Sequence, residues 1–375
     1  MATLRVRCLL VSLFALLLGQ ASQAATYTFY HLGVAGAVNG VHQPVSISTV
    51  PLSGSIGTVV GYDQPAGQTG RSFTWVGFTL KTFSTWAAEP TAISENSVYA
   101  PLNGAPGTPC NVAYADIAGG YYTPFLNDCE NLLGVNNSGW WTGDTGSNNA
   151  SVVRAWLASC PIANPNPNCP ARVWFTSLGG SYSSGRAVNN VNTVVGVSTT
   201  TAGVYRAIYA SQYNQLLQDF DPNNPGYSSV ANAVNDSNIA VGEIMPGACP
   251  PPSIPVLCTG LGRSRTYSHY LPVQLTIVFN GTSQITSLGS LGGSDGVAMS
   301  INNSGVIVGW STNSAGSRRA FVYSNGVMTD LNLLPRGVTG LGWTMTEADG
   351  INDNGQIVGH ATGPQGQDEI FVLVP

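Results

Sequence analysis

One short phrase recurs several times along the chain, and it limits the possible folds more than any other feature. Residues 301–309 read INNSGVIVG and residues 351–359 read INDNGQIVG, and earlier copies stand at 188–196 and 234–242. Each copy places an Asn/Asp/Ser/Gly cluster between two apolar runs, which is typical of a β-hairpin with a tight turn. A repeat of this size predicts an array of small β units.

The clearest unit spans residues 297–331. It predicts four short strands at 297–301, 306–312, 319–324 and 327–331, separated by turns rich in Asn, Ser and Gly. Four antiparallel strands within about 40–50 residues are typical of one blade of a β-propeller. The chain is therefore expected to be all-β.

A glycine closes the second strand of each unit and marks the copies. It stands at Gly61, Gly143, Gly196, Gly242, Gly309 and Gly359. The interval between Gly61 and Gly143 has room for one further unit, and a degenerate copy of the repeat lies there at 93–101. The sequence thus predicts seven four-stranded blades.

The two ends of the chain complement each other in the phase of the repeat. Residues 370–374 match a third strand, and residues 26–33 match a fourth strand. Pairing of these segments would close the ring and remove an exposed sheet edge. An open β-solenoid is the alternative, but the short regular rungs of a solenoid are missing. We expect residues 25–375 to form a single propeller domain.

Residues 1–24 have the pattern of a secretory signal peptide. Arg5 and Arg7 precede an apolar run at 8–18, and Ser22-Gln23-Ala24 offers small residues at a cleavage site. A membrane anchor is the alternative, but the run is shorter than the ~20 residues that a spanning helix needs. We therefore expect a secreted or periplasmic protein.

The charge balance excludes two classes of partner. The chain has 13 basic and 18 acidic residues, and loss of Arg5 and Arg7 with the leader makes it more acidic. Nucleic acids and anionic membrane surfaces are bound through basic patches. We expect neither as a partner, and no second segment is apolar enough to span a membrane.

Six cysteines remain after the leader, and they fall into neighbouring pairs that bracket loops rich in Pro, Asn and Gly. The pairs are Cys110 with Cys129, Cys160 with Cys169, and Cys249 with Cys258. In an exported chain this pattern favours local disulfides that staple the loops. A zinc site is the alternative, but the CxxC spacing and accompanying histidines are absent.

The repeat resembles the HAF family of extracellular repeats found in secreted bacterial proteins. That family's unit combines an Asn-containing turn, a "VVG" strand, a "HAF" strand and a "GxMxDLG" strand. Residues 301–309, 319–323 and 326–331 are similar to these elements. The resemblance implies a β-propeller and export, and it implies no established activity.

At the histidine position of that motif this chain mostly carries arginine. Arg71, Arg206 and Arg319 lie ten residues after their marker glycine and Arg154 lies eleven after, whereas Glu369 takes the place in the last unit. In a closed ring, equal phase places these arginines on a partial circle. They could grip anionic groups such as uronic acids or sulfated sugars. Alternatively, each could pair with an acid such as Asp63, Asp144 or Asp330.

Two further features bear on ligands. Tyr121 and Tyr122, inside the Cys110–Cys129 loop, are candidates for a sugar-binding surface. The turn at 352–355 faintly resembles a calcium loop, but Asp353 is its only carboxylate. We interpret the Asn/Asp turns as residues chosen for backbone geometry, and we expect no metal or other cofactor.

Catalytic patterns are scarce. The four histidines form no HExxH motif, and we interpret the Ser-rich segments as loops. A glycosidase needs only two carboxylates, and Glu347 with Asp349, or Asp128 with Glu130, could supply them. The leading interpretation is a secreted, non-catalytic binding or adhesion module for carbohydrate or a cell-surface partner. A polysaccharide-degrading enzyme and a structural component of an extracellular matrix or surface layer are the alternatives.

Overall fold

The computed structural model describes most of the chain after residue 26. The described residues are 27–35, 37–38, 41–42, 45–51, 53–63, 71–82, 89–95, 99–103, 111–116, 121–126, 131–145, 152–159, 173–211, 214–222, 227–246, 270–277, 283–335 and 342–375. The leader and all six paired cysteines lie outside this set, so the signal peptide and the disulfides stay predictions.

The described residues form β-strands and one short 3₁₀ turn, η1 (Leu331–Leu333). Most strands belong to four-stranded antiparallel sheets, which we number along the chain. Sheet 1 contains β4 (Ser46–Ile47), β5 (Val59–Asp63), β6 (Arg71–Val76) and β7 (Thr79–Thr82). Sheet 2 contains β8 (Glu89–Pro90), β9 (Tyr99–Asn103), β10 (Asn111–Asp116) and β11 (Tyr121–Leu126). Sheet 3 contains β12 (Asn131–Val135), β13 (Trp140–Asp144), β14 (Ala155–Ser159) and β15 (Val173–Trp174).

The later sheets have longer strands and repeat the same order. Sheet 4 contains β16 (Gly179–Val188), β17 (Thr193–Thr200), β18 (Tyr205–Ser211) and β19 (Asn214–Asp219). Sheet 5 contains β20 (Tyr227–Val234), β21 (Ile239–Pro246), β22 (Leu271–Thr276) and β23 (Gln284–Ser287). Sheet 6 contains β24 (Gly292–Ile301), β25 (Ile307–Asn313), β26 (Arg318–Ser324) and β27 (Val327–Asp330).

Sheet 7 joins the two ends of the chain. It contains β28 (Thr344–Ile351), β29 (Ile357–Thr362), β30 (Asp368–Val374) and β1 (Thr28–Ala35). As predicted, β1 is antiparallel to β30, with Thr28 opposite Val374 and Tyr30 opposite Val372. A separate two-stranded ribbon pairs β2 (Ala37–Val38) with β3 (Val41–His42).

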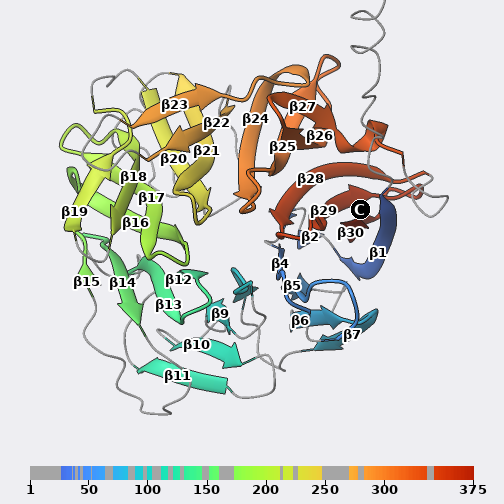
Figure 1. Ribbon diagram of the computed structural model, residues 1–375, viewed down its shortest axis with the longest axis horizontal. Helices are drawn as coiled ribbons and strands as arrows, with labels where there is room; N and C mark the ends of the chain where they lie inside the picture. The colour runs from blue at the N-terminus through green and yellow to red at the C-terminus, as the bar shows by residue number, and fades with distance from the viewer. Residues whose placement is uncertain are drawn as a thin grey trace, which may run out of the picture.

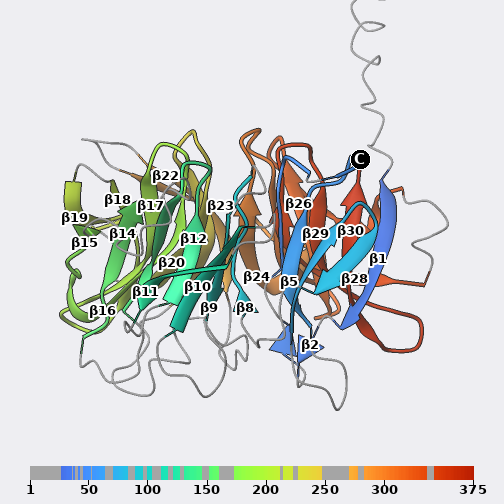
Figure 2. The same cartoon turned by 90° about the horizontal axis from the view of Figure 1, so that it is seen from below.

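The sheets stand side by side around a common axis (Figure 1). Each packs against the next in chain order, and β28 of sheet 7 contacts β4 of sheet 1. A view from the side shows the strands running up and down between two end faces (Figure 2). The prediction of an all-β propeller is therefore confirmed.

The Asn/Asp clusters form the turns between the first and second strands, as predicted. In each clear copy the amide N–H of the fourth turn residue donates to the carbonyl of the first, for example Gly305 to Asn302 at 3.0 Å and Asn238 to Asn235 at 3.0 Å. That fourth residue has a positive φ, 77° at Gly305 and 60° at Asn238. Glycine and asparagine tolerate this conformation better than other residues.

The marker glycines allow a bulge in the first strand of each unit. A Cβ on Gly196 or Gly309 would overlap the carbonyl oxygen of Ser184 or Val297 on the neighbouring strand. The strand pairing shifts by one residue next to this contact in sheets 3 to 7. The "VVG" pattern therefore lets the first strand approach closely and bulge.

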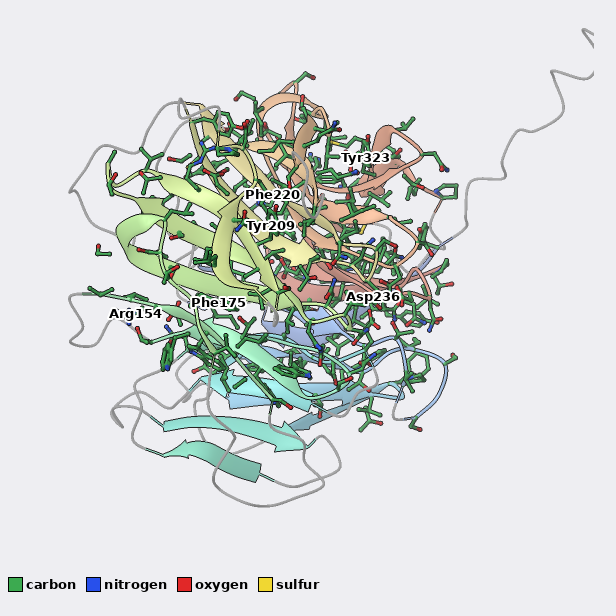
Figure 3. All side chains as sticks on the ribbon, turned by 60° about the vertical axis from the view of Figure 1, so that its left-hand side comes forward. Arg154, Phe175, Tyr209, Phe220, Asp236 and Tyr323 are labelled. Carbon is green, nitrogen blue, oxygen red and sulfur yellow. The ribbon has the colours of Figure 1, made fainter. Side chains whose placement is uncertain are left out.

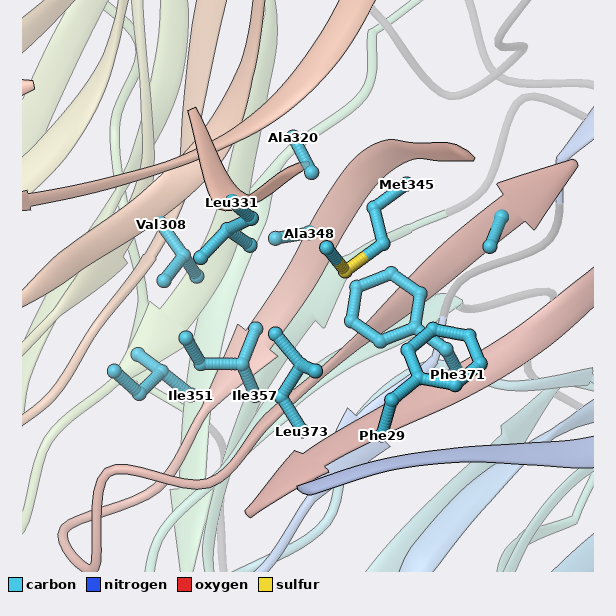
Figure 4. Packing of buried hydrophobic residues seen from close by; sticks show 11 residues of the cluster. Phe29, Val308, Ala320, Leu331, Met345, Ala348, Ile351, Ile357, Phe371 and Leu373 are labelled. Carbon is cyan, nitrogen blue, oxygen red and sulfur yellow. The ribbon is translucent and has the colours of Figure 1, made fainter. Parts of the chain in front are cut away.

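The hydrophobic core lies between adjacent sheets. The cluster between sheets 6 and 7 includes Phe29 of β1, Phe371 of β30 and Met345 of β28 (Figure 4). The rings of Phe29 and Phe371 stack with centroids 5.9 Å apart. Full burial of each such side chain contributes roughly 1.5–3 kcal/mol, so this core holds the closing strand in place.

Candidate functional site: the axis of the propeller

The first asparagine of each clear turn reaches into the next sheet. Its Nδ2 donates to the backbone carbonyl of the equivalent residue there, and we name these five residues the asparagine ring. The distances are 2.9 Å for Asn136 to Asn189, 2.8 Å for Asn189 to Asn235, 3.1 Å for Asn235 to Asn302, 3.0 Å for Asn302 to Asn352 and 2.7 Å for Asn352 to Ser48. The ring links sheets 3, 4, 5, 6, 7 and 1 in sequence.

The same asparagines also fix their own turns. The Oδ1 of Asn189 accepts from the N–H groups of Val191 at 3.2 Å and Thr193 at 2.8 Å. The asparagine ring is buried, and its amides are used on both sides. Its role is therefore structural, because a satisfied buried amide is not offered to a ligand.

The residue after the asparagine in each turn forms a second ring. Its backbone N–H donates to the side-chain oxygen of the equivalent residue in the following sheet. The distances are 3.0 Å for Asn137 to Asn190, 2.8 Å for Asn190 to Asp236, 2.9 Å for Asp236 to Asn303, 2.7 Å for Asn303 to Asp353 and 3.1 Å for Asp353 to Thr49. These contacts need a side-chain acceptor, which explains the preference for Asn, Asp or Thr at this position.

Glu95 of sheet 2 occupies the same turn position and joins the second ring across the axis. Its carboxylate accepts from Nδ2 of Asn137 and of Asn190 at 3.3 Å each, and it has a longer contact of 3.5 Å with Asn303. Burial, together with the nearby charges of Asp353 and Asp236, raises the pKa of Glu95. Glu95 therefore connects three sheets that are far apart in the sequence.

No metal centre is evident at this end of the ring. Within the residues that the structure describes, no group of three or more His, Cys, Asp and Glu side chains is arranged to hold a metal ion.

The described residues also contain no helix with the length and apolar character needed to cross a bilayer.

Next to the two rings, the first strands expose a different set of residues to the axis. The residue three places before each ring asparagine sits at the register shift. A bulge turns this residue out of the regular alternation of the strand. We name these bulge residues: Leu133, Arg186, Asn232, Met299 and Asp349. Val45 and Thr91 hold the equivalent places in sheets 1 and 2.

The bulge residues, together with Val45 and Thr91, line one cavity of about 260 Å³ on the axis. At ~30 Å³ per molecule this space equals roughly nine waters. Other lining residues such as Val188 and Ile351 directly precede ring asparagines, so the cavity adjoins the asparagine ring.

Charged and amide side chains line this cavity on sheets 4, 5 and 7. Arg186 donates from Nη1 to Oδ1 of Asn232 at 2.6 Å, and Asn232 donates from Nδ2 to the carbonyl of Ala298 at 3.0 Å. Asp349 lies 2.9 Å from Nε2 of His360, and both side chains are almost fully buried. Val45, Leu133 and Met299 line the cavity elsewhere, so its wall is amphipathic.

The predicted arginines share one structural position at the start of the third strand. Arg71 lies opposite Asp63, Arg206 opposite Ser198 and Arg319 opposite Ser311, whereas the carbonyl of Arg154 accepts from the N–H of Thr145. Each opposite residue lies two places after a marker glycine. The equal spacing of these arginines from their marker glycines therefore corresponds to the same pairing position between the second and third strands.

Arg206 is engaged inside the protein. Its side chain is 2% exposed, and its Nε lies 3.0 Å from Oδ2 of Asp219 in the same sheet. Nη1 also donates to the carbonyl of Tyr227 in the next sheet at 2.9 Å, and Nη2 donates to the carbonyl of Asp221. This arrangement matches the ion-pair alternative, with Asp219 in place of the acids named from the sequence.

Two of the other predicted arginines, Arg154 and Arg319, have surroundings unlike those of Arg206. Arg154 is exposed at the edge of the molecule, well away from Asp236 of the second ring (Figure 3). Arg319 is half-buried and donates to the carbonyl of Arg318 at 3.0 Å. For Arg71 the backbone alone is described.

Tyr121 and Tyr122 begin β11, where they lie opposite Ala115 and Tyr114 of β10. Only their backbone is described, so their role as a sugar-binding surface stays a prediction.

Of the two carboxylate pairs suggested for catalysis, Glu347 and Asp349 take separate partners. Glu347 pairs with Arg318 of sheet 6 at 2.7 Å, and the guanidinium of Arg318 stacks on Trp310 at 4.1 Å. Asp349 instead pairs with His360 beside the cavity. Alternation along a regular strand would place two such acids on one face, but Asp349 is itself the bulge residue and leaves that alternation. Asp128 and Glu130 lie outside the described residues.

Sequence reasoning missed Arg186, Asn232 and Glu95, and it named Asp349 only as half of a possible catalytic pair. Arg186, Asn232 and Asp349 each stand three places before a turn asparagine, and Glu95 stands where other copies have Asn or Asp. This fixed offset was a usable signal, but only the bulge shows that these positions face the axis.

Comparison with known proteins identifies the fold. No family model and no curated protein matches the chain. A puromycin-hydrolyzing peptidase of Mycobacterium tuberculosis is 11% identical with a TM-score of 0.51, and the match covers 92% of this chain and 54% of that one. An acylaminoacyl peptidase is 7% identical with a TM-score of 0.51, covering 88% and 51%. This chain thus spans about half of each peptidase.

A third solved structure is an oligogalacturonate lyase from Vibrio parahaemolyticus. It is 8% identical with a TM-score of 0.48, and the match covers 94% of this chain and 97% of that one. At these identities the two peptidases show a shared fold and nothing about ligand or reaction.

Proposed function

We propose that this protein is a secreted, non-catalytic, seven-bladed propeller of the HAF type that binds a small hydroxyl-rich ligand, a carbohydrate, in its axial cavity. One observation carries the proposal. The bulge residues occupy one repeated structural position, yet they are chemically unlike each other and line a single cavity.

Some positions carry the same residue type in most units, whereas the bulge positions carry different types, and this contrast supports a binding role. The fold uses the same residue types wherever geometry demands them, as in the asparagine ring and the marker glycines. At the bulge positions the units instead carry leucine, arginine, asparagine, methionine and aspartate. Strand pairing does not require this variety, and bulges commonly re-aim side chains at functional sites.

The chemistry of the wall suits a sugar. Asn232 and Arg186 supply hydrogen-bonding groups for hydroxyls, and Leu133 and Met299 supply apolar surface for the carbon face of a ring. Polar and apolar groups thus share the wall, and a sugar ring presents both kinds of surface.

Cleavage of a polysaccharide is a second candidate, and the Asp349–His360 pair favours it. A carboxylate and an imidazole 2.9 Å apart beside a cavity could serve acid–base chemistry. Both side chains are almost fully buried, however, and the Asp349 carboxylate is already engaged by His360. For this reason we favour binding.

A direct binding measurement tests the proposal. The exported protein is titrated with a panel of neutral and acidic mono- and disaccharides in a calorimeter, and it is incubated with alginate, pectin and chitin to detect new reducing ends. We expect saturable 1:1 binding of at least one sugar and no new reducing ends. Product formation would favour the enzyme, and self-association in sizing experiments without sugar binding would favour a structural matrix component.

Two variants locate the site. Met299→Trp fills the cavity and is expected to abolish binding, whereas Val327→Trp places the same side chain at a position that is 62% exposed and should leave binding unchanged. If Met299→Trp folds poorly, Asn232→Ala replaces it as the test. Equal binding by wild type and a folded cavity variant would place the ligand elsewhere.

The predicted signal peptide and disulfides are tested separately. Sequencing of the exported protein should begin at Ala25, and peptide mapping without reduction should recover the three neighbouring cysteine pairs.

A further inference from the structure

We infer that the ligand of the axial cavity is a sugar acid of about one ring, whose single carboxylate is bound by Arg186. This inference rests on the proposed function for the sugar class, and it adds the group that decides specificity. Among the described residues that line the cavity, Arg186 supplies the positive charge and Asp349 supplies the carboxylate.

The guanidinium of Arg186 is positioned by a chain of contacts through three sheets. Asn232 of sheet 5 holds its Nη1 at 2.6 Å, and the amide of Asn232 is itself fixed by the carbonyl of Ala298 in sheet 6 at 3.0 Å. Because Nδ2 of Asn232 donates to that carbonyl, its Oδ1 must face Arg186. The planar guanidinium is thereby held at the cavity wall, where its fork of donors matches the two oxygens of a carboxylate.

The opposite charge in the cavity restricts the ligand to one acidic group. Asp349 is held by His360 at 2.9 Å beside the cavity, and its negative charge repels a second carboxylate. Glu95, Asp236 and Asp353 add negative charge at the adjoining end of the axis. A ligand with one carboxylate and several hydroxyls satisfies both sides of the cavity.

The size and polarity of the cavity support the same class. About 260 Å³ is below the range of ~300–1,000 Å³ that is common for drug-sized ligands, so a single ring is favoured over a chain. The apolar residues Val45, Leu133 and Met299 lower the local dielectric. A charge-assisted hydrogen bond is stronger there than in water.

The test compares acidic sugars with their neutral parents. Glucuronate, galacturonate, glucose and galactose are each titrated by calorimetry into wild type, Arg186→Met, Arg186→Lys and the exposed control Arg154→Met. In wild type we expect an acidic sugar to bind about 10- to 100-fold more tightly than its parent. Arg186→Met should remove that difference, because the acidic sugar loses a charge-assisted contact that the neutral sugar never makes. Arg186→Lys should retain part of the preference, and Arg154→Met should behave as wild type.

The outcomes separate the two proposals. Saturable binding with no preference for the acid in wild type overturns the role of Arg186 and leaves the proposed function standing. An acid preference that survives in a folded Arg186→Met protein overturns it as well. Absence of saturable binding for every sugar overturns both proposals. Circular dichroism and urea denaturation establish that each variant is folded, and Arg186→Gln replaces Arg186→Met if the latter does not fold.

Discussion

Asn302 and Asn352 are joined by a hydrogen bond of 3.0 Å between the side-chain amide of the first and the backbone carbonyl of the second. They lie in equivalent turns of neighbouring sheets, and both are almost completely buried. The same step is repeated between other sheets, so one polar contact, copied around the axis, ties the first strands together at one end of the propeller.

Replacement of a ring asparagine should destabilise the protein strongly. Asn302→Ala removes the bond to Asn352 and the bond from the N–H of Val306 at 2.9 Å, and it leaves buried backbone groups without partners. We expect a loss of about 2–4 kcal/mol in the free energy of unfolding, measured by urea denaturation. Ser304→Ala, at an exposed place in the same turn, is the control and should change stability by less than about 0.5 kcal/mol. Similar losses for both variants would mean that the turn matters and the ring does not.

The buried Arg206–Asp219 pair should be needed for stability and not for ligand binding. Arg206→Met leaves Asp219 without its cation and the carbonyl of Tyr227 without its donor. Because Asp219 remains partly exposed, we expect a loss of about 2–4 kcal/mol, somewhat below that for a fully buried pair. Arg154→Met, which changes an exposed arginine at the same strand position, should be nearly neutral. A wild-type stability with lost sugar binding in Arg206→Met would restore the arginine circle as the ligand site.

Glu95 should make stability depend on pH in the mildly acidic range. Its pKa is raised in the folded protein, so the folded state binds its proton more tightly than the unfolded state does. Stability therefore falls as pH rises from the ordinary glutamate value, about 4.3, through the raised pKa of Glu95. This contribution is fully present below the ordinary value and is lost above the raised one.

Glu95→Gln should remove that dependence. The amide keeps an oxygen that can accept from Asn137 and Asn190 and loses the repulsion from Asp236 and Asp353. We expect the variant to be more stable than wild type at pH 7 by no more than about 1 kcal/mol, because solvent screens the half-buried carboxylate. Urea denaturation at pH 4 to 7 measures this, and parallel pH profiles for the two proteins would contradict it.

Closure of the ring should depend on Phe29. Phe29 stacks on Phe371 and contacts Trp343, with ring centroids 5.9 Å apart in both cases. Phe29→Ala should cost about 3–5 kcal/mol through lost burial and the cavity left behind. Thr28→Ala, at the neighbouring exposed position of β1, is the matched control and should change stability little. Hydrogen exchange should show β30 losing protection first in Phe29→Ala, because β30 pairs with β1.

Much of the architecture was predictable because its determinants are local. The Asn and Gly residues of each turn specify hairpins, and the spacing of copies specifies one sheet after another. The phase of the two chain ends predicted that β1 would pair with β30, and it does. The shared position of Arg71, Arg206 and Arg319 also followed from counting residues along a strand.

The side-chain partners that form once the sheets have packed could not be predicted in this way. Alternation along a regular strand would place Glu347 and Asp349 on one face, but the bulge at Asp349 breaks it and the two acids take different partners. The partner of Arg206 is Asp219, which the repeat does not mark. Both outcomes depend on side-chain geometry after the sheets have packed.

The sequence by itself determined the repeat unit, its turns and the closing of its ends, since these depend on residues close together in the chain or on the phase of the copies. Only the tertiary structure decided that Glu95 meets Asn137, Asn190 and Asn303, and that Arg186 and Asp349 share a cavity. The physical reason is that ring closure brings together positions that are distant in the chain, such as Glu95 and Asn303, which are 208 residues apart. Their distances are set by how the sheets pack, which no local pattern records.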